Sequence, residues 1–144
     1  MYEYRCKVKK VVDGDTVDVD IDLGFDIILT DQRIRLYGID TPESRTRDKV
    51  EKRYGKAAKE YLQGMLGKDA TLKTHKDAKG KFGRILGEFI VYDAESDRYC
   101  SVNQLMIDKH LAVEYYGQSK DDIENEHIRN RDLLEGKYID HIKV

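Results

Sequence analysis

The sequence predicts an α+β fold, a five-stranded β-barrel of the OB type with about three helices, in a single domain of residues 1–144. Three observations predict it. In several stretches apolar and polar residues alternate with a period of two, as in strands with one buried face. A stretch with helical spacing follows the first three strand-like stretches, and two more strand-like stretches follow it. That order of elements is typical of OB barrels.

The first half of the chain is predicted to be a meander of strands. The three strands cover residues 4–12, 16–23 and 33–39, and residues 25–30 lie between the second and the third. Asp13 and Gly14 form a tight turn between the first two. Residues after Gly24 are expected to continue the sheet beyond a bend. The last strand is indicated by Ile34 and Leu36, which alternate with polar neighbours.

The second half is predicted to mix helices and strands. A helix is expected over 50–65, strands over 70–76 and 84–92, a helix over 101–109, an extended segment over 111–115 and a helix over 121–135. The first helix is indicated by the spacing of Val50, Tyr54, Ala57, Ala58, Tyr61, Leu62 and Met65. Gly67 is its expected C-cap, and Ser101 with Gln104 resembles a capping box. The last helix has Ile123, Ile128, Leu133 and Leu134 as its expected anchors.

Charge limits the partners that the whole surface can attract. The chain has 26 Lys and Arg against 28 Asp and Glu, a net charge of -2. It therefore has no overall attraction for nucleic acid, and phosphate binding requires a local cluster of cations. No apolar stretch is long enough to span a bilayer, so we expect no membrane association. We also expect the protein to be a monomer. The N-terminus lacks the apolar run of a secretory signal, which favours the cytoplasm, unless a signal was removed and the protein is secreted.

Cysteine and histidine spacing does not favour a zinc site. Cys6 and Cys100 stand far apart in the sequence, and the four histidines are scattered. Cys6 alternates with Val8 on a predicted strand, so we expect it to fill the core. The histidines are interpreted as surface or packing residues.

In the stretch VVDGDTVDVDID, residues 11–22, the residues at even and at odd positions are predicted to lie on opposite faces of a strand. Asp18, Asp20 and Asp22 fall on one face of the predicted strand, which we expect to face solvent. Asp15 falls on the opposite face with Val17, where an ionised carboxylate needs a partner. Taken alone, this pattern favours a turn residue that accepts hydrogen bonds from nearby amides. The alternative is a metal ligand, which the rest of the chain favours.

Five charged residues at predicted strand ends or turns have the chemistry that phosphodiester hydrolysis needs. They are Asp15, Arg35, Asp40, Glu43 and Arg84. Asp15 and Asp40 supply oxygen ligands for a hard cation, and Glu43 is available to orient and deprotonate water. The planar guanidinium groups suit a phosphoryl transition state. Each residue alone also reads as an ordinary surface or turn residue, and only their joint occurrence favours a site.

The same residues lie in motifs that resemble those of the staphylococcal nuclease (thermonuclease) family. The resemblance runs from about residue 4 to about residue 135, through VVDGDTV, RIRLYGIDTPE, EKRYGKAA, GKFGR and VNQLMIDKHLA in that order. It implies a five-stranded barrel with three helices that cleaves DNA and RNA with calcium and leaves 3′-phosphate ends. Magnesium is the less expected ion.

The resemblance also implies a role for each position. Asp15 and Asp40 would bind calcium through their carboxylates and Thr41 through its carbonyl, Glu43 would be the general base, and Arg35 and Arg84 would contact phosphate. Tyr115 and Tyr116 fall near the region where the family stacks a base, which favours single-stranded or locally unpaired DNA and RNA as substrates. Phe82 stands where the best-known pattern has a tyrosine near the nucleotide phosphate, so a hydroxyl contact is lost. Residues 23–32 are longer than the corresponding hairpin and are expected to reshape the groove wall.

Two other functions remain open from the sequence. One is a non-catalytic nucleic-acid or protein-binding module, which usually lacks some catalytic residues. The other is an oligosaccharide-binding barrel, which leaves the acids and arginines unexplained. Oligonucleotide binding without turnover would separate the first of these from an enzyme.

Overall fold

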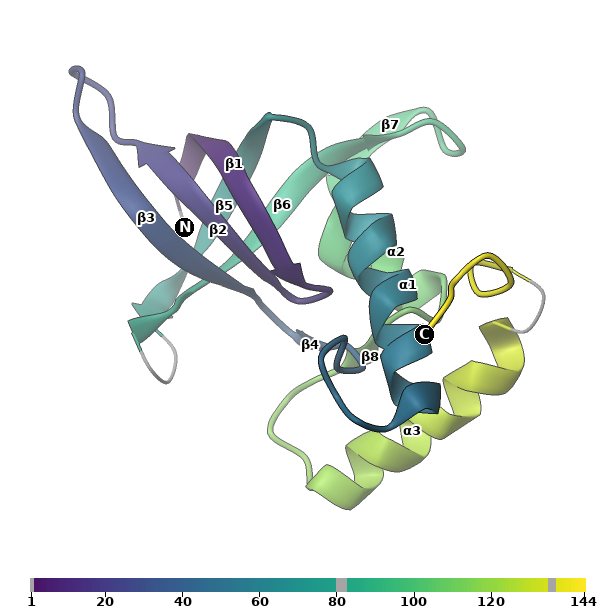
Figure 1. The fold of residues 1–144 in the computed structure, drawn as a ribbon. Helices are drawn as coiled ribbons and strands as arrows, with labels where there is room; N and C mark the ends of the chain where they lie inside the picture. The colour runs from purple at the N-terminus through teal and green to yellow at the C-terminus, as the bar shows by residue number, and fades with distance from the viewer. Residues whose placement is uncertain (1, 80–82, 135–136) are drawn as a thin grey trace.

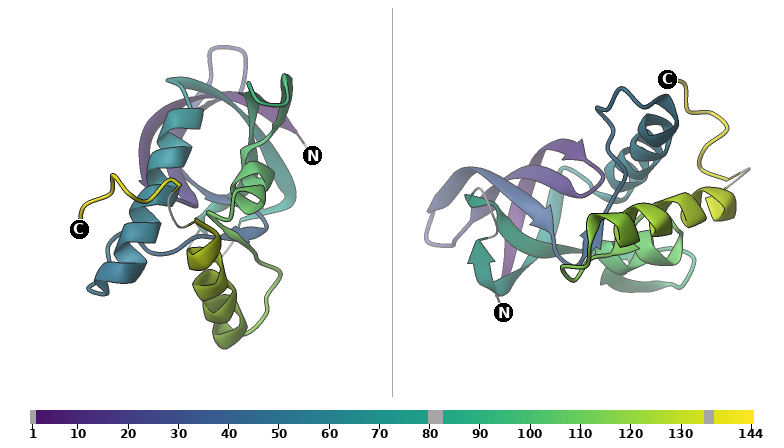
Figure 2. Two further views of the ribbon diagram at one scale, coloured as in Figure 1. Left: turned by 90° about the vertical axis from the view of Figure 1, so that its right-hand side faces the viewer. Right: turned by 90° about the horizontal axis from the view of Figure 1, so that it is seen from below.

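Five strands close into a barrel in the computed structural model, which describes residues 2–79, 83–134 and 137–144. They are β1 (Glu3–Asp13), β2 (Thr16–Asp22), β3 (Ile28–Leu36), β5 (Asp69–Lys79) and β6 (Ile85–Asp93). Antiparallel pairing runs in the order β3-β2-β1-β5-β6, and a parallel pairing of β3 with β6 closes the ring, as the left view of Figure 2 shows. The predicted fold class is confirmed.

Three short strands complete the β structure. The strand β7 (Arg98–Ser101) pairs with the end of β6, and β4 (Ile39–Asp40) pairs with β8 (Val113–Glu114) outside the barrel. The β4–β8 pair lies at the end of the barrel that faces the helices, whereas the β2–β3 turn lies at the opposite end (Figure 1). Asp40 is thereby brought beside residues more than 70 positions later in the chain.

The three predicted helices are present, with corrections at their ends. They are α1 (Lys49–Met65), α2 (Val102–Asp108) and α3 (Lys120–Leu134). Asp48 caps α1 by accepting hydrogen bonds from the amides of Val50 and Glu51. The prediction of Gly67 as its C-cap was wrong, because the chain leaves the helix at Leu66 in an extended conformation. Ser101 occupies the N-cap of α2, but its side chain makes no capping hydrogen bond, so the predicted capping box is absent there.

The turn after β2 differs from the prediction of a continuing sheet. Residues 25–27 form the turn itself, and β3 begins only at Ile28 and runs on to Leu36 as one strand. Phe25 and Asp26 have left-handed backbones with φ of 56° and 61°, which strands do not use. The apolar residues here are not core residues, since Phe25 is 97% exposed.

The barrel interior is packed by the alternating residues that the sequence indicated. Val17 and Val19 on β2 are fully buried, as are Ile34 on β3 and Phe89 on β6. Helix α1 packs against the barrel with its own buried residues Ala57, Ala58 and Leu62. Burying a side chain of this size stabilises the fold by roughly 1.5–3 kcal/mol.

The outer face of β2 carries its aspartates, as the parity pattern predicted. Asp18 accepts hydrogen bonds from the Arg33 guanidinium at 2.8 and 3.1 Å. Asp20 pairs with Lys9 at 3.4 Å and accepts a hydrogen bond from the Asp31 amide. These aspartates therefore take part in charge pairs across the exposed face of the sheet.

Helix α3 does not bury the anchors expected of it. Leu134 is buried and Ile123 is half-buried, but Ile128 and Leu133 are exposed. The prediction was wrong for these two because α3 turns polar residues toward the rest of the protein. No helix in the described part of the chain is long and apolar enough to cross a membrane.

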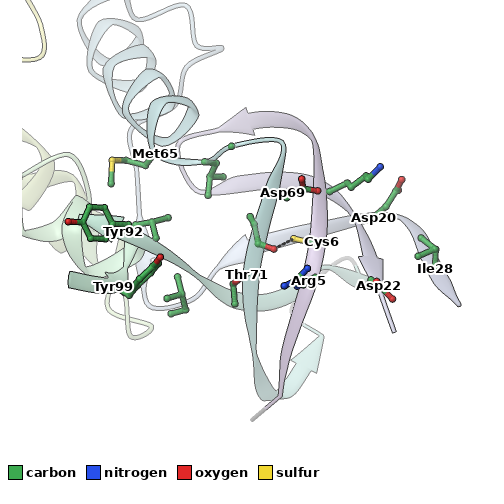
Figure 3. Close-up of a pocket in the computed structure, with 16 residues that line it drawn as sticks. Arg5, Cys6, Asp20, Asp22, Ile28, Met65, Asp69, Thr71, Tyr92 and Tyr99 are labelled. Atoms are coloured by element: carbon green, nitrogen blue, oxygen red, sulfur yellow. Dashed lines mark hydrogen bonds between the residues drawn. The ribbon is translucent and has the colours of Figure 1, made fainter. Parts of the chain in front are cut away.

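Cys6 fills the core at β1, as predicted. Its Sγ lies 3.5 Å from the Ala70 carbonyl oxygen, to which it donates a hydrogen bond (Figure 3). Burial, and secondarily the charge of Asp69, raises the thiol pKa to about 11. Cys100 is half-buried, and burial raises its thiol pKa as well.

Gly55 sets how closely α1 approaches the loop after β4. A Cβ at this position would overlap the Glu43 carbonyl and would lie 2.6 Å from the Ser44 amide nitrogen. The absence of a side chain therefore lets the helix support the backbone that carries Glu43. Gly64 on the same helix has open space around it.

We expect Gly55→Ala to destabilise the protein by about 1–3 kcal/mol, because the methyl group must displace backbone atoms. The matched control is Gly64→Ala, which should stabilise by up to about 1 kcal/mol, because alanine is the better helix former and meets nothing there. Urea unfolding followed by circular dichroism measures both. Equal effects of the two substitutions would contradict the packing described at Gly55.

Thiol alkylation tests the burial of Cys6. In native protein at pH 8, iodoacetamide should modify Cys100 well before Cys6, because a thiol with a pKa near 11 is only about one part in a thousand thiolate. Peptide mass spectrometry gives the two rates. In denaturant the rates should become similar, and similar rates in the native state would refute this packing.

Candidate active site

Asp15 is held beside the turn that joins β1 and β2. The residue is only 8% exposed, and its Oδ1 accepts a hydrogen bond from the Thr16 hydroxyl at 3.0 Å. Its Oδ2 accepts a second one from the Thr41 amide at 3.2 Å. A Cβ at Gly14 would lie 2.9 Å from the Thr41 hydroxyl, so glycine permits this close approach of the turn. The burial that parity predicted for Asp15 is therefore present.

Arg35 joins Asp15 to Asp40. Its Nη2 lies 3.4 Å from Asp15 Oδ2 and 3.4 Å from Asp40 Oδ1, and its Nη1 donates to the Leu36 carbonyl at 3.0 Å. The β2–β3 register pairs Arg35 with Thr16, which puts the guanidinium next to Asp15. Two carboxylates from separate elements thus meet around one nitrogen atom.

Asp40 has a second partner in α3. His127 Nε2 lies 2.8 Å from Asp40 Oδ2. The sequence interpretation of His127 as a surface or packing residue did not include this contact, because 87 positions separate the two residues. The pair connects the C-terminal helix directly to the candidate site.

A cleft of about 1000 Å³ gathers most of the predicted site residues. Arg35, Asp40, Thr41, Glu43, Arg84, Tyr115 and Tyr116 line it, and Asp15 lies beside it in contact with Arg35. Tyr115 and Tyr116 are 43% and 77% exposed. Phe82 lies outside the described residues. The sequence therefore identified side chains that the fold brings to one place.

Other residues of the cleft were missed. Helix α3 contributes Lys120, Glu124, His127 and Arg131, and the start of α1 contributes Asp48 and Glu51. The α3 residues recur at intervals of three and four, so they share one face of the helix. That spacing of polar residues was the available signal, but it is also what a solvated helix face shows.

The start of α1 makes one side of the cleft acidic. The pKa of Glu51 is raised, mainly by burial and further by the charges of Glu43 and Asp48. Arg131 and His127 act in the opposite direction. Neighbouring carboxylates thus disfavour the ionised form of Glu51, which lies on the acidic side of the cleft.

Residues 23–32 do not form a wall of this cleft. None of these ten residues, all of which the structure describes, lines it. They belong to the β2–β3 hairpin, whose turn lies at the far end of the barrel (Figure 1). The expectation that this segment reshapes the groove was therefore wrong, because the extra length extends the hairpin away from the site.

A second hollow of about 780 Å³ lies on the side of the barrel near Cys6. In Figure 3, Met65, Tyr92 and Tyr99 lie on one side of it and Asp20, Asp22 and Ile28 on the other. The side chains are separated by strands β1 and β5 and do not converge on a point. Its buried thiol has a raised pKa, which makes it a poor nucleophile.

The candidate site contains oxygen donors of the kind that bind a hard cation. Within the described residues, no three or more His, Cys, Asp or Glu side chains are grouped so as to hold a metal. Asp15 and Asp40 nevertheless bring two carboxylates together, and the buried Thr41 hydroxyl has no hydrogen-bond partner. Calcium takes carboxylate and backbone carbonyl oxygens together with water. The residues present therefore fit a hard cation.

Comparison with known proteins identifies relatives of the chain. Thermonuclease of Staphylococcus intermedius is 38% identical over 80 residues, which are 55% of this chain and 44% of that protein. Endonuclease YhcR of Bacillus subtilis (strain 168) is 35% identical over 95 residues, 61% of this chain and 7% of that protein. Micrococcal nuclease of Shigella flexneri is 27% identical over 126 residues, 83% of this chain and 64% of that protein.

The chain spans less than two thirds of the length of each of these relatives. Residues 33–133 match the family described as "Staphylococcal nuclease homologue". This match covers well over half of the chain and includes Arg35, Asp40, Glu43 and Arg84. The chain belongs to the staphylococcal nuclease family.

Proposed function

We propose that this chain is a calcium-dependent nuclease that hydrolyses phosphodiester bonds in DNA and RNA. The observation that carries the proposal is the position of Arg35 between Asp15 and Asp40, beside a cleft that Glu43 and Arg84 also line. This reaction requires carboxylates that hold a cation, a carboxylate that directs water, and guanidinium groups that stabilise phosphoryl charge. The relatives named as nucleases support the same conclusion.

Asp15, Asp40 and the Thr41 carbonyl would hold the calcium ion, which supplies polarisation of the phosphoryl oxygen when bound. Asp15 is prepared for this role by its hydrogen bonds from Thr16 and from the Thr41 amide. These contacts fix the carboxylate before any ligand arrives.

Glu43 would direct the attacking water and accept its proton. It is exposed on the cleft wall, where water reaches it, and Gly55 of α1 supports its backbone. Attack of this water on phosphorus would break the bond to the 5′ oxygen, which takes a proton from solvent water in the cleft and leaves as a hydroxyl, while the phosphate stays on the 3′ oxygen. The products would then carry 3′-phosphate ends.

Arg35 and Arg84 would stabilise charge on the phosphoryl group. Arg84 directly precedes β6, and β6 pairs with β3 next to Arg35, so the two cations come from neighbouring strands. Arginine has five N–H donors, more than the contacts of Arg35 with its two carboxylates and the Leu36 carbonyl require. The remaining donors are available to a phosphate.

The substrate would be single-stranded or locally unpaired, and the protein would act as a monomer. Tyr115 and Tyr116 are exposed aromatic residues on the same cleft, where unpaired bases are able to stack on them. Stacking of this kind tolerates any base, so we expect cleavage with little sequence preference.

Calcium dependence is tested by incubating single-stranded DNA and RNA with the protein, with calcium, with magnesium or with chelator. We expect cleavage with calcium, loss of cleavage with chelator, and recovery when calcium is restored. End-labelling of the fragments identifies 3′-phosphate ends. Oligonucleotide binding with no cleavage under any metal condition would favour a non-catalytic binding module.

The arginine and acid roles are tested by Arg84→Ala and Asp40→Ala. Each should lower kcat/KM by at least about a hundredfold, because Arg84 would donate to the charged transition state and Asp40 would hold the cation that polarises the phosphoryl oxygen. Arg98→Ala, at an exposed residue of β7, is the control and should keep the normal rate. Circular dichroism verifies folding, and near-normal turnover in either site variant would remove that residue from the proposed mechanism.

A further inference from the structure

The pair of His127 and Asp40 is more buried than a surface ion pair. The His127 side chain is 10% exposed and that of Asp40 31%, and their atoms are 2.8 Å apart. By comparison, the similar contact of His141 with Glu60 at 2.6 Å joins two side chains that are both more than half exposed. A shielded hydrogen bond of this length restrains the carboxylate far better than an exposed one.

The two oxygens of Asp40 have different partners. Oδ2 faces His127, whereas Oδ1 faces Arg35 Nη2, the atom that also contacts Asp15. A quarter-turn of the carboxylate about its Cβ–Cγ bond would break both contacts. His127 and Arg35 together therefore fix the plane of the Asp40 carboxylate, with one oxygen on the side of Asp15.

We propose that His127 is a positioning residue for the metal ligand Asp40. It holds Oδ2 so that Oδ1 alone is presented, with Asp15, to the bound cation. This inference rests on the proposed function, since it concerns the same ion site. Hydrogen bonds to ligating carboxylates typically raise metal affinity 10- to 100-fold.

Docking of α3 does not depend on this histidine alone. Asn130 Nδ2 donates to the Ala112 carbonyl at 3.3 Å, and the Tyr54 hydroxyl donates to the Arg131 carbonyl at 3.4 Å. The Arg131 guanidinium also lies 5.6 Å from the centre of the Tyr54 ring. Because other contacts attach the helix, loss of the His127 hydrogen bond is separable from loss of helix docking.

Two amide substitutions that differ only in reach test the proposal. Glutamine at position 127 carries an N–H donor at nearly the reach of the histidine Nε2, whereas asparagine is one methylene shorter. We expect His127→Gln to bind calcium within about threefold of the wild type and His127→Asn to bind at least about tenfold more weakly. Isothermal titration of the full chain with calcium alone measures this without substrate or turnover.

Two further variants separate positioning from structure. Asn130→Ala weakens helix docking without touching Asp40, and His141→Asn removes the exposed pair with Glu60. Both should bind calcium like the wild type. If Asn130→Ala weakened binding as much as His127→Asn, helix docking would be the cause and the inference would be wrong.

The outcomes also distinguish this inference from the proposed function. If the wild type binds and uses calcium while His127→Asn binds it equally well, the positioning role of His127 is wrong and the nuclease proposal is unaffected. If the wild type binds no calcium and cleaves nothing, both the positioning role and the nuclease proposal are wrong. Weaker binding by His127→Asn, rescued by His127→Gln, supports the inference.

Discussion

Two like-charged carboxylates are held together in this protein by one guanidinium group. Asp15 ends the β1–β2 turn and Asp40 lies in β4, and their mutual repulsion would separate them without Arg35. The position of Arg35 depends in turn on barrel closure, because β3 must pair with β2 on one side and with β6 on the other. The site is therefore a consequence of the closed barrel, and its charges are compensated before any ligand binds.

The barrel strands and the burial of Asp15 could be predicted from sequence because alternation along a strand is a local signal. Alternation of odd and even positions from Asp15 through β2 separated the buried Asp15 from the outward-facing Asp18, and it gave Val17 and Val19 as core residues. The prediction failed where backbone geometry overrides apolar content, as at Phe25. It also could not find the β4–β8 pair, because two-residue strands are too short to leave a periodic pattern.

Helix α3 shows why the remainder of the site was missed. A polar helix face normally indicates solvent, and the apolar residues on the other side indicate the core. Here Ile128 and Leu133 are exposed, while the face that carries His127 and Arg131 lines a cleft. The sequence analysis named only the apolar anchors of this helix, and the fold shows that its polar face meets Asp40 through His127. Helix α3 therefore contributes side chains to the candidate site in addition to its contacts with the rest of the fold.

Charge balance links ion binding to substrate binding. Among the described residues that line the cleft, acids outnumber the lysines and arginines, and Arg35 is already compensated by Asp15 and Asp40. A nucleic acid entering this cleft would meet a field that does not attract it, and the net charge of -2 offers no compensation from elsewhere. Under the proposed function, a divalent cation held by the two aspartates would reverse that local balance and would release further donors of Arg35 for phosphate. In the proposed enzyme each ligand then raises the affinity for the other, since such coupling is reciprocal.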